Sequence, residues 1–384
     1  MRIILILFFF TQILYSQIED NIYKLNSLDN NFLTEDVMKI IDQNIEGKQT
    51  IFLGEAVHFS GSDFLAKTEF VKYLVTEHGY KDIAFEADFF SLLFDHNKRH
   101  LPKMWSSSIQ CKELMTFLEE KNVTIWGFDN RIVTYYSYKN FTNKLSEFLK
   151  TNNIEIEEKF ITLSNLLIKN QYESRKLFSK KDKEYLNKYI SELLKKEKIQ
   201  SYKLWEQILV NYQSNVEFYT IKDNKTDSKR IPIRDKQMAK NLDFIVKQNP
   251  DKKFVVWLAN AHMSKCNHES MKGMTMGYQF TELNPNTSYH IAFGSINRYN
   301  RSVKEKTIIK ASKNNNNILY YLPSIHKNYF LDSKGLTTDF KNKDYKDSEI
   351  FNLYNLYRKK TDLLNHFDAL VFIGEEWIEV SYEK

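Results

Sequence analysis

Short apolar runs recur along the chain, and longer segments with helical spacing separate them. The runs are almost continuously apolar and lack the alternation of half-exposed strands, which is typical of strands buried on both faces of a parallel sheet. The pattern predicts strands at residues 50–55, 81–88, 123–129, 252–262, 288–296 and 367–374. We therefore expect an α/β fold with a mostly parallel β-sheet flanked by helices.

The stretch from about 140 to 230 differs from the rest because it contains no strand-like run. It is rich in Leu, Ile, Lys and Glu with helical spacing. This pattern predicts a large helical insertion of several helices that packs as a cap over the sheet.

The N-terminus, MRIILILFFFTQILYSQ, places one arginine before a short apolar run that ends in small or polar residues. This is the layout of a secretory signal, and we expect cleavage after Ser16. No later stretch reaches the roughly 20 apolar residues that a spanning helix needs. The pattern predicts a signal peptide at residues 1–16 and one exported domain at 17–384, periplasmic or secreted, with no stable membrane span after cleavage.

The amino-acid composition and net charge indicate what kind of molecule the protein binds. The 384 residues are 42% hydrophobic, enough for a sizeable core, and the formal net charge of +6 falls to +5 when Arg2 leaves with the signal. Lysines are scattered among nearly as many acids, which is typical of a solvated surface, and we expect no nucleic-acid partner. Cys111 and Cys266 match no zinc or redox spacing, and the sequence leaves their pairing and the oligomeric state open.

Polar residues end four of the predicted strands. They are Glu55, Glu86 with Asp88, Asp129, and Asn260 with His262. Ligands bind at the carboxyl ends of strands in open α/β sheets, so the coincidence favours one polar pocket. The alternative is that polar residues end strands because strands end at the surface.

Lys67 gives an independent indication of a site. It lies three and four residues before Phe70 and Val71, on the apolar face of a helix predicted from residue 63 to 79. A buried lysine needs an anionic partner, and Lys67 is within reach of Glu55 or Glu86. The alternative is that Lys67 lies at the helix edge and extends its ammonium group to solvent.

Six motifs resemble the erythromycin esterase family. They are LGEAVHF at 53–59 with a lysine nine positions after His58, AFEAD at 84–88, WGFD at 126–129, RDKQMAKN at 234–241, VVWLANAHMSK at 255–265 and MGYQF at 276–280. The resemblance implies an esterase that hydrolyses a cyclic ester such as a macrolide lactone, and thus a role in antibiotic resistance. It also implies that Arg234 lines the pocket.

One departure from the family pattern falls at Ala259, where the family has the first histidine of His-Asn-x-His. Family esterases use that histidine in catalysis. The departure leaves open a catalytically impaired binding protein of the same fold.

The chain has no Gly-x-Ser-x-Gly motif, which argues against a serine esterase. We expect water attack on a carboxylic ester or macrolide lactone, with His58 as general base assisted by Glu55 or Glu86. The other expected contacts, to the substrate or the developing oxyanion, are from Lys67, His262, Asp129, Asn260 and Arg234. An exported hydrolase that acts on a different cell-surface ester or peptide is a further alternative.

A metal site competes with this hypothesis. Zinc or manganese could use a ligand set of Glu55, His58, Glu86 and His262. His58 and His262, the two histidines of this set, lack the tight His-x-x-x-His spacing. We expect no cofactor and a small-molecule ester or lactone as the partner, with a divalent metal as the alternative.

Overall fold

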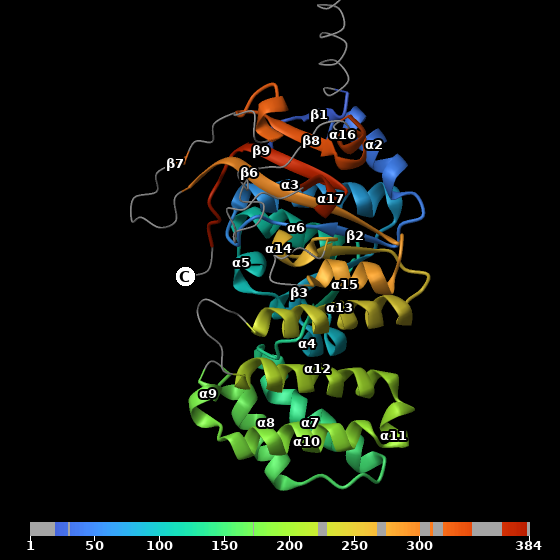
Figure 1. Cartoon of the computed structure of the whole chain (residues 1–384), viewed down its shortest axis with the longest axis vertical. Coiled ribbons are helices and arrows are strands. Elements are labelled where there is room, and N and C mark those ends of the chain that lie inside the picture. The colour runs from blue at the N-terminus through green and yellow to red at the C-terminus, as the bar shows by residue number, and fades with distance from the viewer. Residues whose placement is uncertain are drawn as a thin grey trace, which may run out of the picture. The chain divides into compact units, whose positions relative to one another are not determined.

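The computed structural model describes residues 20–29, 31–171, 173–221, 229–266, 274–299, 308–309, 318–339 and 363–381. The predicted signal peptide lies outside these residues. The chain divides into two compact units, drawn in Figure 1: unit 1 comprises the described residues within 1–81, 103–123 and 253–384, and unit 2 those within 82–102 and 124–252. The predicted single domain with a helical cap stays a prediction, and each unit is described by itself.

The sheet of unit 1 runs in the order β1-β8-β9-β6-β2-β5. The strands are β1 (Ile22–Leu25), β2 (Thr50–Leu53), β5 (Phe254–Trp257), β6 (Ser288–Tyr299), β8 (Asn328–Asp332) and β9 (Ala369–Glu375), and β7 (Ile308–Ile309) pairs with β6. The four strands β5, β2, β6 and β9 are parallel, whereas β8 is antiparallel to β9 and to β1. Every residue of β2 and β5 is buried, as the apolar runs predict.

Helices of unit 1 are α2 (Glu35–Ile45), α3 (Gly61–His78), α5 (Lys103–Ser106), α6 (Ile109–Glu120), α14 (Asn260–Met263), α15 (Met276–Leu283), α16 (Ser333–Asp339) and α17 (Leu363–His366), with a short 3-10 helix at Ile318–Tyr321. Helix α3 packs against β6, β9 and α6. It begins after Ser60, whose hydroxyl accepts from Asp63 N at 3.5 Å, and it ends at Gly79 in the left-handed conformation. Its predicted apolar face is buried.

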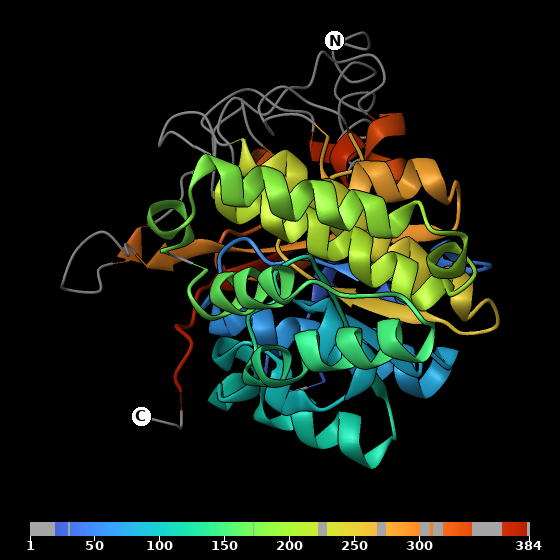
Figure 2. The same ribbon diagram turned by 90° about the horizontal axis from the view of Figure 1, so that it is seen from below.

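Unit 2 contains the parallel pair β3 (Asp82–Asp88) and β4 (Thr124–Asp129). Its helices are α4 (Phe89–Phe94), α7 (Tyr135–Thr151), α8 (Glu158–Lys169), α9 (Ser174–Leu177), α10 (Lys180–Leu194), α11 (Glu197–Gln200), α12 (Lys203–Thr220) and α13 (Arg230–Gln248), with a 3-10 helix at Lys98–His100. Figure 2 shows α7 to α13 in green and yellow. Helix α12 packs against both α10 and α13, and α13 packs against β4.

The α/β fold with a mostly parallel sheet is confirmed, and each of the six predicted strands is present. The strand predicted at 252–262 ends at Trp257, because the chain then turns and forms α14. The sequence analysis missed β1, β7 and β8, which lack a long apolar run.

Two further findings concern the whole described chain. Within the described ranges, no helix is long and apolar enough to cross a membrane. No disulfide joins Cys111 to Cys266, both of which the structure describes.

Candidate active site

A tight turn links the carboxyl end of β2 to α3. Gly54 begins this turn, and a Cβ atom there would lie 1.9 Å from Asn260 Oδ1, so the position has no room for a side chain. Phe59 near its end has a φ of 70°, a left-handed conformation that costs about 1–2 kcal/mol for a residue other than glycine. The turn therefore holds a strained backbone beside His58.

Glu55 and His58 form a hydrogen-bonded pair in this turn. His58 Nδ1 lies 2.9 Å from Glu55 Oε1. The Glu55 side chain is fully buried, whereas that of His58 is 41% exposed. Nδ1 of the imidazole is thus held by a buried carboxylate while the side chain is partly exposed, which is the arrangement of an oriented general base.

Lys67 contacts the other oxygen of the Glu55 carboxylate. Its Nζ lies 2.7 Å from Glu55 Oε2, 3.5 Å from Leu258 O and 3.8 Å from the centre of the Trp257 ring. Lys67 is fully buried, so the predicted burial is confirmed and the solvent-facing alternative is wrong. Burial lowers the pKa of Lys67, and the neighbouring Glu55 carboxylate opposes that shift.

Asp63 is a second buried acid near this pair, and the sequence analysis missed it. Its Oδ2 accepts from Ala56 N at 3.1 Å, and Ser295 Oγ donates to its Oδ1 at 3.4 Å. Burial, with smaller contributions from the nearby acids Glu376 and Glu55, raises the pKa of Asp63 to about 7, although the hydrogen bond from Ala56 N opposes the shift. The spacing from Ser60 to Asp63, typical of a helix N-terminus, was the signal in the sequence.

Asn260 and His262 lie on α14 rather than at a strand end. Asn260 is fully buried; its N donates to Glu55 O at 2.9 Å and its Nδ2 to Phe293 O at 2.8 Å. The side chain therefore ties the start of α14 to β6, which lies on the other side of β2 from β5. His262 is partly exposed, and so is Ala259, which begins α14. Substrate contacts by Asn260 and His262 stay predictions.

A separate ion-pair cluster lies in unit 2. Arg234 Nη2 on α13 lies 2.5 Å from Glu86 Oε1 and 2.8 Å from Asp129 Oδ2, and its Nε lies 3.0 Å from Asp129 Oδ1. Arg131 Nε, which the sequence analysis did not single out, lies 2.6 Å from Asp129 Oδ2. The structure thus brings together Glu86, Asp129 and Arg234.

The electrostatics of this cluster follow from its geometry. Burial alone would raise the pKa of Asp129, but Arg131 and Arg234 outweigh burial and lower it to about 2. The same contacts hold the pKa of Arg234 well above its ordinary value, although burial opposes this. The carboxylate of Asp129 and the guanidinium are therefore ionised at neutral pH.

Asp88 has a different role from the other acids that end strands. Its Oδ1 accepts from Ser91 N at 3.1 Å and its Oδ2 accepts from Val133 N at 2.9 Å and from Thr134 N at 3.1 Å. It therefore caps α4 and the start of α7. For Asp88, the interpretation of a structural strand end is sufficient.

The predicted site residues fall into two sets. Unit 1 holds Glu55, His58, Lys67, Asn260 and His262, and unit 2 holds Glu86, Asp129 and Arg234. A single pocket formed by all of them stays a prediction. Within the part of the chain that the structure describes, no group of three or more His, Cys, Asp or Glu residues is arranged to hold a metal ion.

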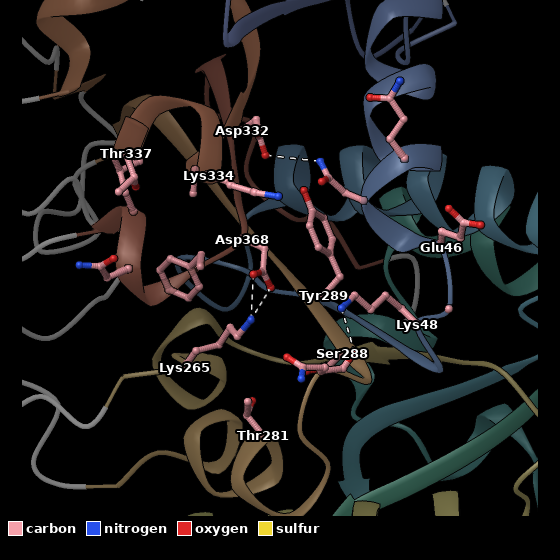
Figure 3. Close-up of a pocket in the computed structure, with 18 of the residues that line it drawn as sticks. Glu46, Lys48, Lys265, Thr281, Ser288, Tyr289, Asp332, Lys334, Thr337 and Asp368 are labelled. Carbon is pink, nitrogen blue, oxygen red and sulfur yellow. Dashed lines mark hydrogen bonds and ion pairs between the residues drawn. The ribbon is translucent and has the colours of Figure 1, made fainter. Parts of the chain in front are cut away.

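A cavity of about 860 Å³ lies elsewhere in unit 1, at the amino ends of β2 and β6 (Figure 3). Lys265 and Asp368 form an ion pair at 2.8 Å in its wall, and Asn44 donates to Asp332 at 3.4 Å. Because Glu55 follows the carboxyl end of β2, this cavity lies at the opposite edge of the sheet from the His58 turn. Lys265 and Asp368 thus compensate each other's charge in its wall. None of the predicted site residues, all of which the structure describes, lines this cavity.

The fold and the polar turn define an α/β protein with candidate catalytic residues at the carboxyl ends of parallel strands. The family model described as erythromycin esterase matches residues 75–375, which is most of the chain. The chain therefore belongs to the erythromycin esterase family. No curated protein matches the chain in sequence.

Three solved structures share the fold. One described as a succinoglycan biosynthesis protein has a TM-score of 0.75 and 17% identity, covering 96% of this chain and 98% of that chain. A protein from Bacillus cereus has a TM-score of 0.71 and 18% identity, covering 97% and 99%. A mutant of the erythromycin esterase EreC in its open conformation has a TM-score of 0.67 and 15% identity, covering 93% and 98%.

Proposed function

We propose that the protein hydrolyses an ester bond of a small molecule, with His58 as the general base. The observation that carries this proposal is the 2.9 Å contact between Nδ1 of the half-exposed His58 and the buried carboxylate of Glu55. Membership of the erythromycin esterase family supports a hydrolase.

The chemistry follows from this pair. A hydrogen bond from His58 Nδ1–H to Glu55 leaves the second ring nitrogen, Nε2, unprotonated. Nε2 takes a proton from water as the water oxygen attacks the ester carbonyl carbon, and a tetrahedral intermediate forms. The imidazolium then donates that proton to the leaving alkoxide, and the carbonyl becomes a carboxylic acid. Glu55 stabilises the imidazolium in between.

The remaining charged residues support these two. The Nζ of Lys67 lies 2.7 Å from the second oxygen of Glu55 and thereby helps to fix the carboxylate that orients His58. We assign the developing oxyanion to His262, a partly exposed residue of α14 with a polar side chain. Glu86, the other acid expected to assist His58, instead lies 2.5 Å from Arg234 within unit 2, so we assign this role to Glu55. Substrate contacts by Arg234 and Asp129 stay predictions.

The substrate class follows from the family. A macrolide lactone is our first candidate, because an erythromycin esterase, EreC, is among the solved structures with this fold. Export to the periplasm or the medium would let the enzyme meet an antibiotic outside the cytoplasm. An exported hydrolase of a different cell-surface ester or peptide would use the same chemistry.

A binding protein without turnover is the second candidate. Ala259 favours it, because the family has a catalytic histidine at this position. Ala259 is partly exposed at the start of α14, so a histidine introduced there would have access to solvent and ligand.

The test is hydrolysis of a macrolide lactone and of simple carboxylic esters by residues 17–384, followed by mass spectrometry. Matched samples are His58→Asn, Ala259→His and the protein after chelation. Product that is absent with His58→Asn would support the hydrolase, and loss on chelation would favour the metal alternative. Binding without product, with turnover restored by Ala259→His, would support the binding protein.

A further inference from the structure

The segment that follows β9 runs beside the His58 turn. We call residues 377–381 the C-terminal strap. Trp377 and Val380 of this strap are 44% and 50% exposed. The strap therefore contributes little to the hydrophobic core, and hydrogen bonds hold it in place.

The strap binds the main chain on both sides of Ser60. Gly61 N donates to Trp377 O at 2.7 Å, and Ser62 N donates to the same oxygen at 3.3 Å. Glu379 N donates to Phe59 O at 2.9 Å. These contacts form the antiparallel bridge of Ser60 with Ile378.

These contacts involve two parts of the turn that need support from outside it: the first amide groups of α3 and the left-handed residue Phe59. Gly61 and Ser62 carry the first amide groups of α3, which no residue within the helix can satisfy. Phe59 has the left-handed conformation that needs support from its surroundings. The strap thus satisfies the start of α3 and restrains the carbonyl of the strained residue next to His58.

Contacts on both sides of the bridge hold the strap itself. Toward β9, Glu376 N donates to Asn297 O at 2.8 Å. Toward the C-terminus, Ile109 N donates to Val380 O at 2.8 Å, and Gln110 Oε1 accepts from Val380 N at 3.0 Å. The strap is therefore fixed to β6 and to α6, independently of the turn.

From this geometry we infer that the C-terminal strap is a positioning element for His58. It holds the backbone of residues 59–62 so that the imidazole meets Glu55. This inference rests on the proposed function for its effect on turnover, but the orientation of the His58 ring is measurable without turnover. Glu379 reaches Phe59 through its amide, whereas its side chain hydrogen-bonds Ser108, next to α6.

The experiment compares Glu379→Pro, which removes the amide that binds Phe59 O, with Glu379→Ala, which keeps it. Deletion of residues 377–384 is the second test, with deletion of 382–384 as its control because the strap stays whole. We measure kcat and KM on the ester that the wild type hydrolyses. We also record the ¹⁵N signals of the His58 ring, assigned with His58→Asn.

We expect Glu379→Pro and the longer deletion to lower kcat at least about tenfold with little change in KM, because misplaced catalytic groups lose rate. Their His58 ring should lose the ¹⁵N pattern of a ring protonated at Nδ1, while both controls keep it. Wild-type kcat and ring signals in folded Glu379→Pro would overturn the inference. So would unfolding of both test variants while the controls fold, since the strap would then serve the fold as a whole.

Absence of turnover in the wild type would reject the proposed function alone. The ring signals would still decide on the strap, because the orientation of His58 toward Glu55 does not depend on a substrate.

Discussion

Glu55 Oε1 lies 2.9 Å from Nδ1 of His58, and the carboxylate that makes this contact has no exposed surface. A buried carboxylate without compensating contacts is costly, and Glu55 is compensated by the ammonium group of Lys67 at 2.7 Å. The buried Lys67 thus holds the Glu55 carboxylate in place, and this carboxylate in turn orients the partly exposed imidazole of His58.

Replacing Glu55 tests the orienting role. In Glu55→Gln the neutral amide no longer stabilises the imidazolium, and its NH₂ group can select the wrong tautomer of His58. We expect kcat to fall by about 10²–10⁴. Steady-state kinetics on a folded variant measure this, and a loss below about threefold would show that Glu55 is not the assisting acid.

Removing the Lys67 ammonium group should lower the free energy of unfolding. Lys67→Met leaves the Glu55 carboxylate buried without its cation, so we expect the free energy of unfolding to fall by about 3–5 kcal/mol. In a Glu55→Gln background the same substitution should cost clearly less, because no buried charge remains. Urea unfolding of the four proteins gives the coupling between the two residues; equal costs in both backgrounds would argue against the pair.

Asp63 predicts a pH dependence of stability. Its pKa is raised from 3.8 to about 7 by burial and by Glu376 and Glu55, so its protonated form favours the folded state. This contribution is complete below about pH 3.8 and is lost as the pH rises through about 7. The loss is on the order of 4 kcal/mol.

The matched variant is Asp63→Asn, which keeps an oxygen for Ala56 N and cannot ionise. We expect it to unfold at higher denaturant than the wild type at pH 8 and at a similar concentration at pH 4. Parallel pH profiles of the two proteins would contradict a raised pKa for Asp63.

In unit 2 we expect that replacing Arg234 lowers the free energy of unfolding. Arg234→Met removes the cation that contacts both Glu86 and Asp129, so we expect a loss of about 3–5 kcal/mol. Arg131→Met is the control, because Arg131 contacts Asp129 from a side chain that is 32% exposed and should contribute less. Hydrogen exchange of the backbone amides in β4 and α13 compares the stability of the two variants. Equal protection in both would contradict a larger contribution from Arg234 than from Arg131.

The sequence predicted the parts of this fold that depend on continuous burial. β2 and β5 are buried throughout and, apart from Thr50, apolar, because both of their faces are covered, so their runs could be found without a structure. The buried position of Lys67 followed in the same way from its place on the apolar face of α3.

The sequence could not predict which polar atoms meet. Periodicity indicates that a residue is buried, but not which partner satisfies it. Asn260 donates to Phe293 O, which is remote in sequence, and no pattern in the sequence indicates this partner. The strap residue Glu379 meets Phe59 through main-chain atoms alone, and no side-chain pattern reports such a contact.

The most direct test of the account is kcat for His58→Asn relative to the wild type, on an ester or lactone that the wild type hydrolyses. Circular dichroism and urea unfolding would verify the fold of the variant, since the half-exposed His58 contributes little to the core. We predict a loss of at least about 10², the usual contribution of a general base. Turnover of the variant within about threefold of the wild type would contradict the assignment of His58 as the base.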